Sequence, residues 1–372
     1  MKVCFVVNKL SFFLSHRLDL GKEIASIHDF TLITDLGGVT NQEKKMLASN
    51  NIQVIHLKKR SRSEGWRGWF RYLYSLKIII QQSSPRYIFY VTLELSMFGA
   101  LLHNFVGGKK SFFLITGLGH HLISNNFKMV LRRIIQRILN QMLYIKKDHL
   151  FIFQNQDDRK LFIQKNMSYR KKTQIIRGNG VNSDIFKFVN RKKDDPLIIL
   201  FAARLVTSKG IREFISASKV LAKKYPEVIF KVAGQYNPKD TESISKKFFD
   251  ELCETIDYVG DIEYSKMPTT LAEASVFILP SYGEGLPKVA LEAGSTGLPL
   301  ILTNVAGCRD CIDNHKNGFL VETKDVDDLV KKIEILIMDI DLRLSQGINS
   351  RNYISKYFSN EVIHSSYIDL IK

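Results

Sequence analysis

Short apolar runs recur along the chain, and longer polar or amphipathic stretches separate them. Continuous apolar runs of this length are typical of strands that are buried on both faces of a parallel sheet. The pattern predicts strands at 2–7, 30–34, 52–57, 87–91, 111–115 and 149–153 in the first half, and at 197–202, 228–233, 255–259, 276–279, 299–302 and 318–321 in the second half. Strands that alternate with helices indicate an α/β fold, in which helices cover both faces of parallel sheets.

A polar segment from Phe188 to Asp195, followed by Pro196, lies between the two sets of strands. The 372 residues also exceed what one ordinary hydrophobic core requires. The sequence therefore predicts two Rossmann-like domains that face a cleft, with the boundary between residues 187 and 188.

Two glutamates, Glu284 and Glu292, stand eight positions apart after the predicted strand at 276–279. Ligands of open α/β sheets bind at the carboxyl ends of the strands. Pro287 suits the first position of a helix, whose free N–H groups and dipole can bind a phosphate. A phosphate would repel both carboxylates, so neutral hydroxyls, such as those of a sugar or a ribose, are their natural partners. Alternatively, Glu284 only complements the helix dipole and Glu292 is a solvated helical residue.

The segment from Val276 to Val321, with its Glu-Gly-Leu-Pro and Leu-Glu-Ala elements, resembles the donor-binding segment of the GT-B glycosyltransferases, specifically the retaining family 4, also called glycosyl transferases group 1. Further matches follow in the family's order: Phe201-Ala-Ala-Arg-Leu205, Lys209-Gly210, Val232-Ala-Gly234, Val259-Gly260 and Val305-Ala-Gly-Cys-Arg309. The resemblance implies an acceptor-binding domain at 1–187, a donor-binding domain at 188–348 and a C-terminal helix at 349–372 that returns to the first domain.

The resemblance also implies a role for each matching residue. Arg204 and Lys209 would bind the diphosphate of a nucleotide sugar and stabilise the leaving group, although either can also be an ordinary surface cation. Glu284 would hold hydroxyls of the transferred sugar, and Glu292 would accept hydrogen bonds from the ribose. The implied donor-binding residues are Gly234, Val259, Gly260, Gly285, Leu286, Pro287, Lys288 and Glu292.

Two segments of the first half resemble a subset of the family that includes bacterial N-acetylgalactosamine transferases acting on lipid-linked sugars. They are Phe12-Phe-Leu-Ser-His-Arg17 and Thr116-Gly-Leu-Gly119. They imply an acceptor site formed by Ser15, His16, Arg17, Thr116, Gly117 and Gly119, with His120 as a further catalytic candidate. His16 and His120 can equally be structural residues.

Together these matches predict a retaining transferase that moves a hexose or N-acetylhexosamine from a UDP-sugar to a polyprenyl-diphosphate-linked glycan in bacterial surface polysaccharide synthesis. A GT-B nucleotide-sugar epimerase and a basic binding protein without catalysis are the alternatives. The Asp-x-Asp patterns at 325–327 and 339–341 lie in charged stretches that look helical, so we interpret them as surface patterns. The prediction includes neither a metal nor another cofactor.

The net charge of +17 suggests an anionic partner. Basic and aromatic residues are interleaved from Lys58 to Tyr72, and basic residues flank an apolar helical stripe from Phe127 to Lys147. Such elements can bind an anionic membrane surface, or their apolar faces can simply pack on the protein. No nucleic-acid-binding signature accompanies them, so nucleic acid is not a predicted partner.

The first apolar run, Val3 to Val7, is too short for a signal peptide, and no stretch resembles a transmembrane helix. We therefore expect a cytoplasmic protein that is peripheral on the inner face of the plasma membrane. The close pair Cys308 and Cys311 lacks two further ligands at zinc-site spacing, and we predict a structural role for it.

Overall fold

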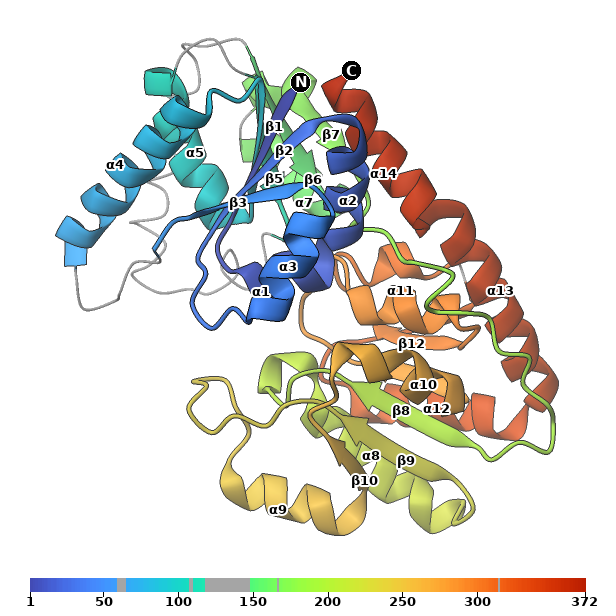
Figure 1. Cartoon of the computed structure of the whole chain (residues 1–372). Helices are drawn as coiled ribbons and strands as arrows, with labels where there is room; N and C mark the ends of the chain where they lie inside the picture. Colours follow the sequence, from blue (N-terminus) through green and yellow to red (C-terminus); the bar gives the residue numbers. More distant parts are fainter. Residues whose placement is uncertain (59–64, 107–109, 118–147, 166, 314) are drawn as a thin grey trace. The chain divides into compact units, whose positions relative to one another are not determined.

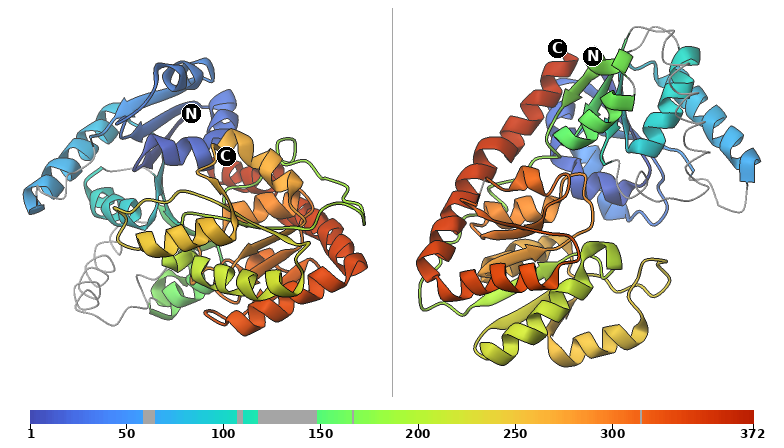
Figure 2. Two further views of the ribbon diagram at one scale, coloured as in Figure 1. Left: turned by 90° about the horizontal axis from the view of Figure 1, so that it is seen from below. Right: turned by 180° about the vertical axis from the view of Figure 1, so that it is seen from behind.

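A computed structural model describes residues 1–58, 65–106, 110–117, 148–165, 167–313 and 315–372. The chain divides into two compact units. The first unit contains Met1–Asn179 together with His364–Lys372, and the second contains Gly180–Ile363. In both units, helices lie on the two faces of one parallel sheet (Figures 1 and 2).

The first unit has a seven-stranded sheet in the order β3-β2-β1-β4-β5-β6-β7. Its strands are β1 (Lys2–Val7), β2 (Asp29–Thr34), β3 (Ile52–His56), β4 (Tyr87–Val91), β5 (Lys110–Ile115), β6 (His149–Phe153) and β7 (Thr173–Ile175). Its described helices include α1 (Leu10–His16), α2 (Leu18–Ile27), α3 (Asn41–Ser49), α4 (Gly65–Ser83), α5 (Leu93–Val106) and α7 (Gln156–Lys165).

The second unit has a six-stranded sheet in the order β10-β9-β8-β11-β12-β13. Its strands are β8 (Ile198–Ala202), β9 (Ile229–Ala233), β10 (Asp257–Gly260), β11 (Val276–Leu279), β12 (Leu300–Thr303) and β13 (Gly318–Val321). Its helices include α8 (Ile211–Lys224), α9 (Lys246–Thr255), α10 (Met267–Glu273), α11 (Lys288–Ser295), α12 (Val326–Met338), α13 (Ile340–Phe358), and the short 3₁₀ helices η4 (Thr207–Lys209) and η5 (Tyr264–Lys266).

The apolar strands are buried as their sequences predict. All four residues of β11 and of β12 are buried, and so are the last five residues of β1. Burial on both faces explains why these strands have no alternation of polar and apolar residues. The α/β class and the two Rossmann-like sheets are confirmed, whereas the three-residue edge strand β7 was not predicted because Thr-Gln-Ile is too short to give a pattern.

The boundary between the units differs from the prediction at residue 188. Val181 pairs with the end of α13, since its N–H donates to the carbonyl of Phe358 at 2.9 Å and its carbonyl accepts from Asn360 at 3.1 Å. Phe186 is fully buried in the core of the second unit. The second unit therefore begins at Gly180.

The C-terminal segment joins the first unit later than position 349. α13 packs on α11 within the second unit, and only the chain from His364 onward belongs to the first unit. The helix α14 (Asn360–Ile368) contributes Tyr367, whose buried ring lies 6.2 Å from that of Phe89 in β4. His364 also pairs with Glu23 of α2 at 2.6 Å.

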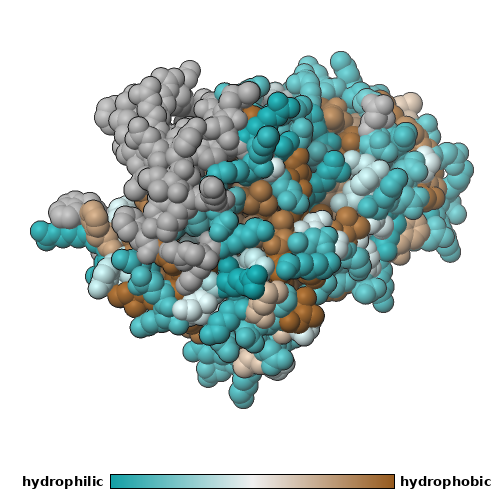
Figure 3. Space-filling view, turned by 90° about the horizontal axis from the view of Figure 1, so that it is seen from above, coloured by the Kyte–Doolittle hydropathy of each residue, from teal (hydrophilic) through white to brown (hydrophobic). Residues whose placement is uncertain are grey.

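On the face shown in Figure 3, hydrophobic residues lie among hydrophilic ones. Within the described ranges, no helix is both long enough and apolar enough to cross a membrane.

Candidate active site

Loops at the carboxyl ends of four neighbouring strands of the second unit approach one another closely. Gly234 follows β9 with a φ of 145°, and a Cβ added there would lie 1.8 Å from the carbonyl oxygen of Ala203, which follows β8. Gly307 follows β12, and its added Cβ would lie 2.4 Å from the carbonyl oxygen of Gly285, which follows β11. Only glycine allows backbones to meet at these distances. This edge of the sheet is the expected ligand-binding edge.

An ion pair joins the end of η4 to the loop after β11. The Lys209 Nζ lies 2.5 Å from Glu284 Oε1, and their side chains are 24% and 11% exposed. Lys209 is followed by Gly210, whose left-handed conformation turns the chain into α8. The structure therefore brings together Lys209, the residue predicted to bind the diphosphate, and Glu284, the residue predicted to bind the sugar. Both side chains are largely buried.

Glu292 lies in α11 with only 4% of its side chain exposed. Its Oε1 is 2.8 Å from the Nζ of Lys288, one helical turn earlier, and 2.8 Å from the hydroxyl of Tyr264 in η5. Burial raises the pKa of the Glu292 carboxyl, while the charge and hydrogen bond of Lys288 and the hydrogen bond of Tyr264 oppose that rise. The alternative of a solvated Glu292 is therefore wrong.

The loop between the two glutamates differs in detail from the prediction. α11 begins at Lys288, and Pro287 precedes it with a φ of −75° and a ψ of 103°. Pro287 is thus the flanking residue rather than the first helical one, because its ψ is extended. The Ala290 N–H already donates to the Pro287 carbonyl at 3.0 Å, so the earlier amides of the first turn, those of Lys288 and Val289, are the ones that can donate to an anion.

The remaining predicted donor-binding residues lie around this edge. Arg204 follows β8, but its side chain is 59% exposed and its Nη1 is 3.0 Å from Asp240 Oδ2. Val259 is exposed at the end of β10, and open space surrounds Gly260 on the side where a Cβ would lie. Leu286 packs partly on the core. Glu284 thus contacts Lys209, whereas the guanidinium of Arg204 contacts Asp240.

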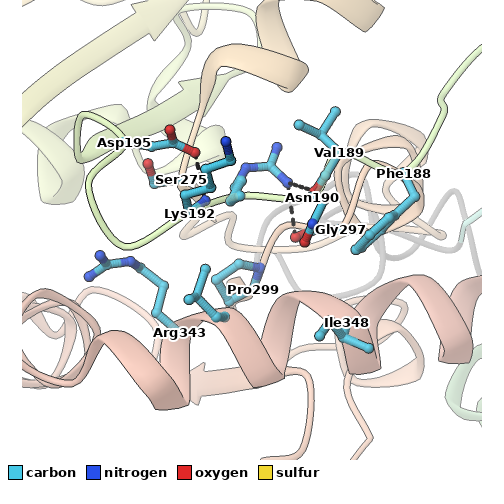
Figure 4. Close-up of a pocket in the computed structure, with 12 residues that line it drawn as sticks. Phe188, Val189, Asn190, Lys192, Asp195, Ser275, Gly297, Pro299, Arg343 and Ile348 are labelled. Atoms are coloured by element: carbon cyan, nitrogen blue, oxygen red, sulfur yellow. Dashed lines mark hydrogen bonds between the residues drawn. The ribbon is translucent and has the colours of Figure 1, made fainter.

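A small cavity lies at the opposite edge of the same sheet (Figure 4). Its lining includes Asp195, Ser275 and Pro299, which precede β8, β11 and β12. Its volume of about 130 Å³ is well below the roughly 300 Å³ or more of a typical ligand pocket. This cavity is therefore too small for a nucleotide sugar.

Arg191, which also lines this cavity, has a structural role. Its guanidinium donates to the carbonyls of Leu271 and Ala274 at the end of α10, at 3.0 and 2.5 Å. It also donates to the carbonyls of Thr296 and Gly297 at the end of α11, at 2.9 and 3.1 Å. Burial lowers the pKa of Arg191 to about 10, so the side chain remains charged at neutral pH.

The family model of glycosyl transferases group 1 matches residues 182–353, which contain every loop of this edge. The second unit contains a glycosyl transferases group 1 domain. The predicted family and enzyme class are therefore confirmed. The comparisons support neither the epimerase nor the non-catalytic binding protein.

Two curated relatives of this glycosyltransferase are similar over different lengths. The N,N'-diacetylbacillosaminyl-diphospho-undecaprenol alpha-1,3-N-acetylgalactosaminyltransferase of Campylobacter jejuni is 29% identical over 286 residues, which are 73% of each chain. The UDP-Gal:alpha-D-GlcNAc-diphosphoundecaprenol alpha-1,3-galactosyltransferase of Escherichia coli is 28% identical over 193 residues. That match covers 48% of this chain, and the chain spans about half, 47%, of the relative's length.

A solved structure of Anabaena HepE in complex with UDP resembles the whole chain. Its TM-score is 0.78 at 16% identity, and the match covers 100% of this chain and 99% of that one. At this identity the likeness concerns the fold alone. It agrees with the predicted GT-B class.

The predicted acceptor residues follow β1 and β5 in the first unit. The hydroxyl of Ser15 lies 2.6 Å from His16 Nδ1, and the His16 ring stacks on Phe12 at 4.5 Å. Thr116 and Gly117 directly follow β5. Gly119 and His120 lie outside the described residues, so their predicted roles stay predictions.

Arg17 differs from the other acceptor candidates because only 1% of it is exposed. Its guanidinium lies 5.0 Å from the ring centroid of Tyr367 in the C-terminal segment. The three guanidinium nitrogens of Arg17 are buried and have no hydrogen-bond partner among the described residues, so the aromatic ring is the favourable contact that the structure gives this cation. The structure thus gives Arg17 a packing contact with Tyr367, and its role in acceptor binding stays a prediction.

The Asp-x-Asp patterns begin with two helix caps. The side chain of Asp325 accepts a hydrogen bond from the Asp328 N–H at the start of α12, and Asp339 does the same for Leu342 at the start of α13.

Cys308 and Cys311 are fully buried, and burial raises the pKa of both thiols. Among the described residues, no group of three or more His, Cys, Asp or Glu side chains could hold a metal.

Tyr264 is one residue of this edge that sequence reasoning missed. It is 28 positions from Glu292 and belongs to none of the matched motifs. Its place just after β10, at the carboxyl edge, is the only signal that could have indicated it.

Proposed function

We propose that the chain transfers a hexose or N-acetylhexosamine, with retention, from a UDP-sugar to a polyprenyl-diphosphate-linked saccharide during bacterial surface polysaccharide synthesis. The observation that carries the proposal is the Lys209–Glu284 pair beside the buried Glu292, all at the ligand-binding edge of a group 1 domain. The names of the Campylobacter and Escherichia relatives, which specify undecaprenol-diphosphate acceptors, support the acceptor class.

Different residues of the site bind different parts of the donor. Lys209 and the first-turn amides of α11 bind the diphosphate, and Arg204 joins them when its exposed side chain leaves Asp240. Glu284 holds hydroxyls of the transferred sugar, and Glu292 accepts hydrogen bonds from the ribose. Gly234, Gly260 and Gly285 border the donor, and Gly234 also lets the loop after β9 approach the carbonyl of Ala203.

The charge of Lys209 is the main catalytic contribution. Negative charge grows on the diphosphate as its bond to the anomeric carbon breaks, and a preorganised ammonium stabilises that state more than the ground state. Glu284 holds the ammonium in place before the donor binds, because it already lies 2.5 Å away. No step requires a metal or another cofactor.

The experiment that tests this function uses purified full-length protein, UDP-sugars and GDP-sugars, and a short-chain lipid-diphosphate saccharide. A sugar attached to the lipid supports the proposal, and the donor screen identifies the sugar and the nucleotide. An altered free nucleotide sugar without lipid product would contradict it, as would the absence of any product across the screen. Lys209→Met serves as the inactive control.

We also place the protein on the inner face of the plasma membrane as a peripheral cytoplasmic enzyme. One face of α4 carries the exposed residues Arg67, Phe70, Arg71 and Tyr74 at helical spacing, whereas Leu76 and Ile80 of the same helix are fully buried. Phe70 and Tyr74 are 68% and 65% exposed. A stripe of arginines and aromatic residues fits an anionic bilayer surface. The predicted basic helix at 127–147 lies outside the described residues.

Vesicle sedimentation tests this placement. Replacing Arg67 and Arg71 with Gln should reduce binding to vesicles with anionic lipid by about thirtyfold, since each of the two surface cations contributes about 1 kcal/mol. The charge-matched control replaces Lys246 and Lys331 in the second unit with Gln and should leave binding unchanged. Equal binding by both double variants would contradict a role for α4.

A further inference from the structure

Tyr264, Lys288 and Glu292 form a cluster in which each side chain contacts the other two. Besides their bonds to Glu292 Oε1, Lys288 also donates to the Tyr264 hydroxyl, and its Nζ lies 4.0 Å from the centroid of the Tyr264 ring. The ring of the buried Phe186 lies 6.0 Å from that of Tyr264. Two elements separated in the sequence, η5 and α11, thus fix one carboxylate.

Both contacts use the same oxygen of Glu292. An ionised carboxylate has two oxygens and about four acceptor positions in total. Two donors on Oε1 orient the carboxylate and leave acceptor capacity for the two vicinal hydroxyls of a ribose. Lys288 also supplies the positive charge that an almost fully buried carboxylate needs to stay ionised.

We propose that Tyr264 and Lys288 are positioning residues for the ribose of the donor, acting through Glu292. This inference rests on the proposed function, in which Glu292 binds the ribose. It assigns to Lys288 a role different from direct donor binding, and it gives Tyr264 a role that no motif indicates. Loss of either residue should reduce recognition of the ribose hydroxyls specifically.

The test compares two probes, UDP and 2′,3′-dideoxy-UDP, by calorimetry. Wild-type protein should bind UDP more tightly, and Glu292→Gln should remove most of that preference. Tyr264→Phe and Lys288→Met should each reduce the preference by about three- to tenfold, because each removes one hydrogen bond that orients the carboxylate. Affinity for the dideoxy probe should change by less than about twofold, since that probe has no hydroxyl for Glu292 to accept from.

The second unit contains a matched control. Lys224, Tyr225 and Glu334 form a cluster of the same three residue types between α8 and α12, with distances of 2.7 and 3.0 Å to Glu334 Oε1. Tyr225→Phe and Lys224→Met remove the same kinds of bonds away from the site. Neither should change the affinity of either probe.

The outcomes separate the inference from the proposed function. If Glu292→Gln keeps the preference for UDP, the ribose role of Glu292 is wrong and the inference fails with it. If Glu292→Gln removes the preference but Tyr264→Phe and Lys288→Met keep it, only the inference fails. An equal loss of affinity for both probes would also overturn it, because that result indicates general damage to the site. The double variant Tyr264→Phe/Glu292→Gln should behave like Glu292→Gln alone.

Discussion

The two Lys–Tyr–Glu clusters of the second unit contain the same chemical groups in different surroundings. At the donor edge, Glu292 is almost completely buried, and burial raises the pKa of its carboxyl despite two hydrogen bonds. On the outer helices, hydrogen bonds from Lys224 and then Tyr225 lower the pKa of Glu334. Desolvation, rather than the identity of the hydrogen-bonding partners, therefore decides whether the pKa of the glutamate is raised or lowered. A buried carboxylate that lacks full compensation is typical of a binding site.

The largest effect is expected from Lys209, whose charge we propose to stabilise the leaving group. Lys209→Met should reduce kcat by about 10²–10³-fold, the usual loss when one transition-state donor is removed. The exposed Lys246, which pairs with Asp250 at 2.6 Å, is the control, and Lys246→Met should keep full activity. Steady-state rates with the lipid-linked acceptor give kcat for both variants. A loss of less than about tenfold for Lys209→Met would contradict a catalytic role for Lys209.

The next effect concerns donor affinity. Glu292→Ala should weaken UDP binding by about 10- to 100-fold, since charge-assisted hydrogen bonds to the ribose are lost. Glu334→Ala, the corresponding change in the outer cluster, should bind UDP like the wild type. Calorimetry with both variants measures the contrast, and equal affinities would show that burial at the edge has no bearing on the donor.

The two carboxyls should also give opposite dependences of stability on pH. The raised pKa of Glu292 means that the folded state binds the proton more tightly than the unfolded chain, so its contribution is present below the ordinary value of 4.5 and is lost as pH rises through the folded pKa. The lowered pKa of Glu334 gives a contribution that is present above 4.5 and is lost as pH falls through the folded pKa.

Urea unfolding at several pH values measures these contributions. The free energy of unfolding of Glu292→Gln should rise relative to that of the wild type as pH rises above 4.5. Glu334→Gln should be slightly less stable than the wild type above pH 4.5, and this difference in the free energy of unfolding should disappear as pH falls below 4.5. Parallel profiles for the two variants would contradict the assignment of burial as the cause.

The smallest effect is expected from the outer cluster itself. The side chain of Lys224 is 63% exposed, so its ion pair with Glu334 is screened by water and salt. Lys224→Met should lower the melting temperature only slightly and should leave UDP affinity unchanged. A large shift in melting temperature would show that exposure alone does not weaken such a pair.

Much of the fold was predictable because strands that are buried on both faces have continuous apolar sequences. β1, β4, β6, β11 and β13 match their predicted bounds. The position of the domain boundary was not predictable in the same way, because Val181 and Phe186 lie in a segment without regular structure whose partners are far along the chain. Burial of Phe186 in the second core depends on contacts that no local pattern encodes.

The site was predictable where spacing within one element determines contact. Lys288 and Glu292 are four residues apart, so a helix must place them together. The Lys209–Glu284 contact follows from the order of parallel strands, since β8 and β11 are neighbours. Tyr264 and Asp240 were missed because loop residues at the ends of β10 and β9 reach their partners through side-chain conformations that sequence spacing does not determine.

The guanidinium of Arg191 gives α11 a cation at its carbonyl end, while the diphosphate of the proposed donor lies at its amide end. This eight-residue helix is then flanked by charges that oppose its dipole at both termini. Arg191, at the opposite edge of the sheet, should thereby contribute to donor affinity without contacting the ligand. Loss of the Arg191 cation should therefore weaken binding of an anionic donor at the opposite end of the helix.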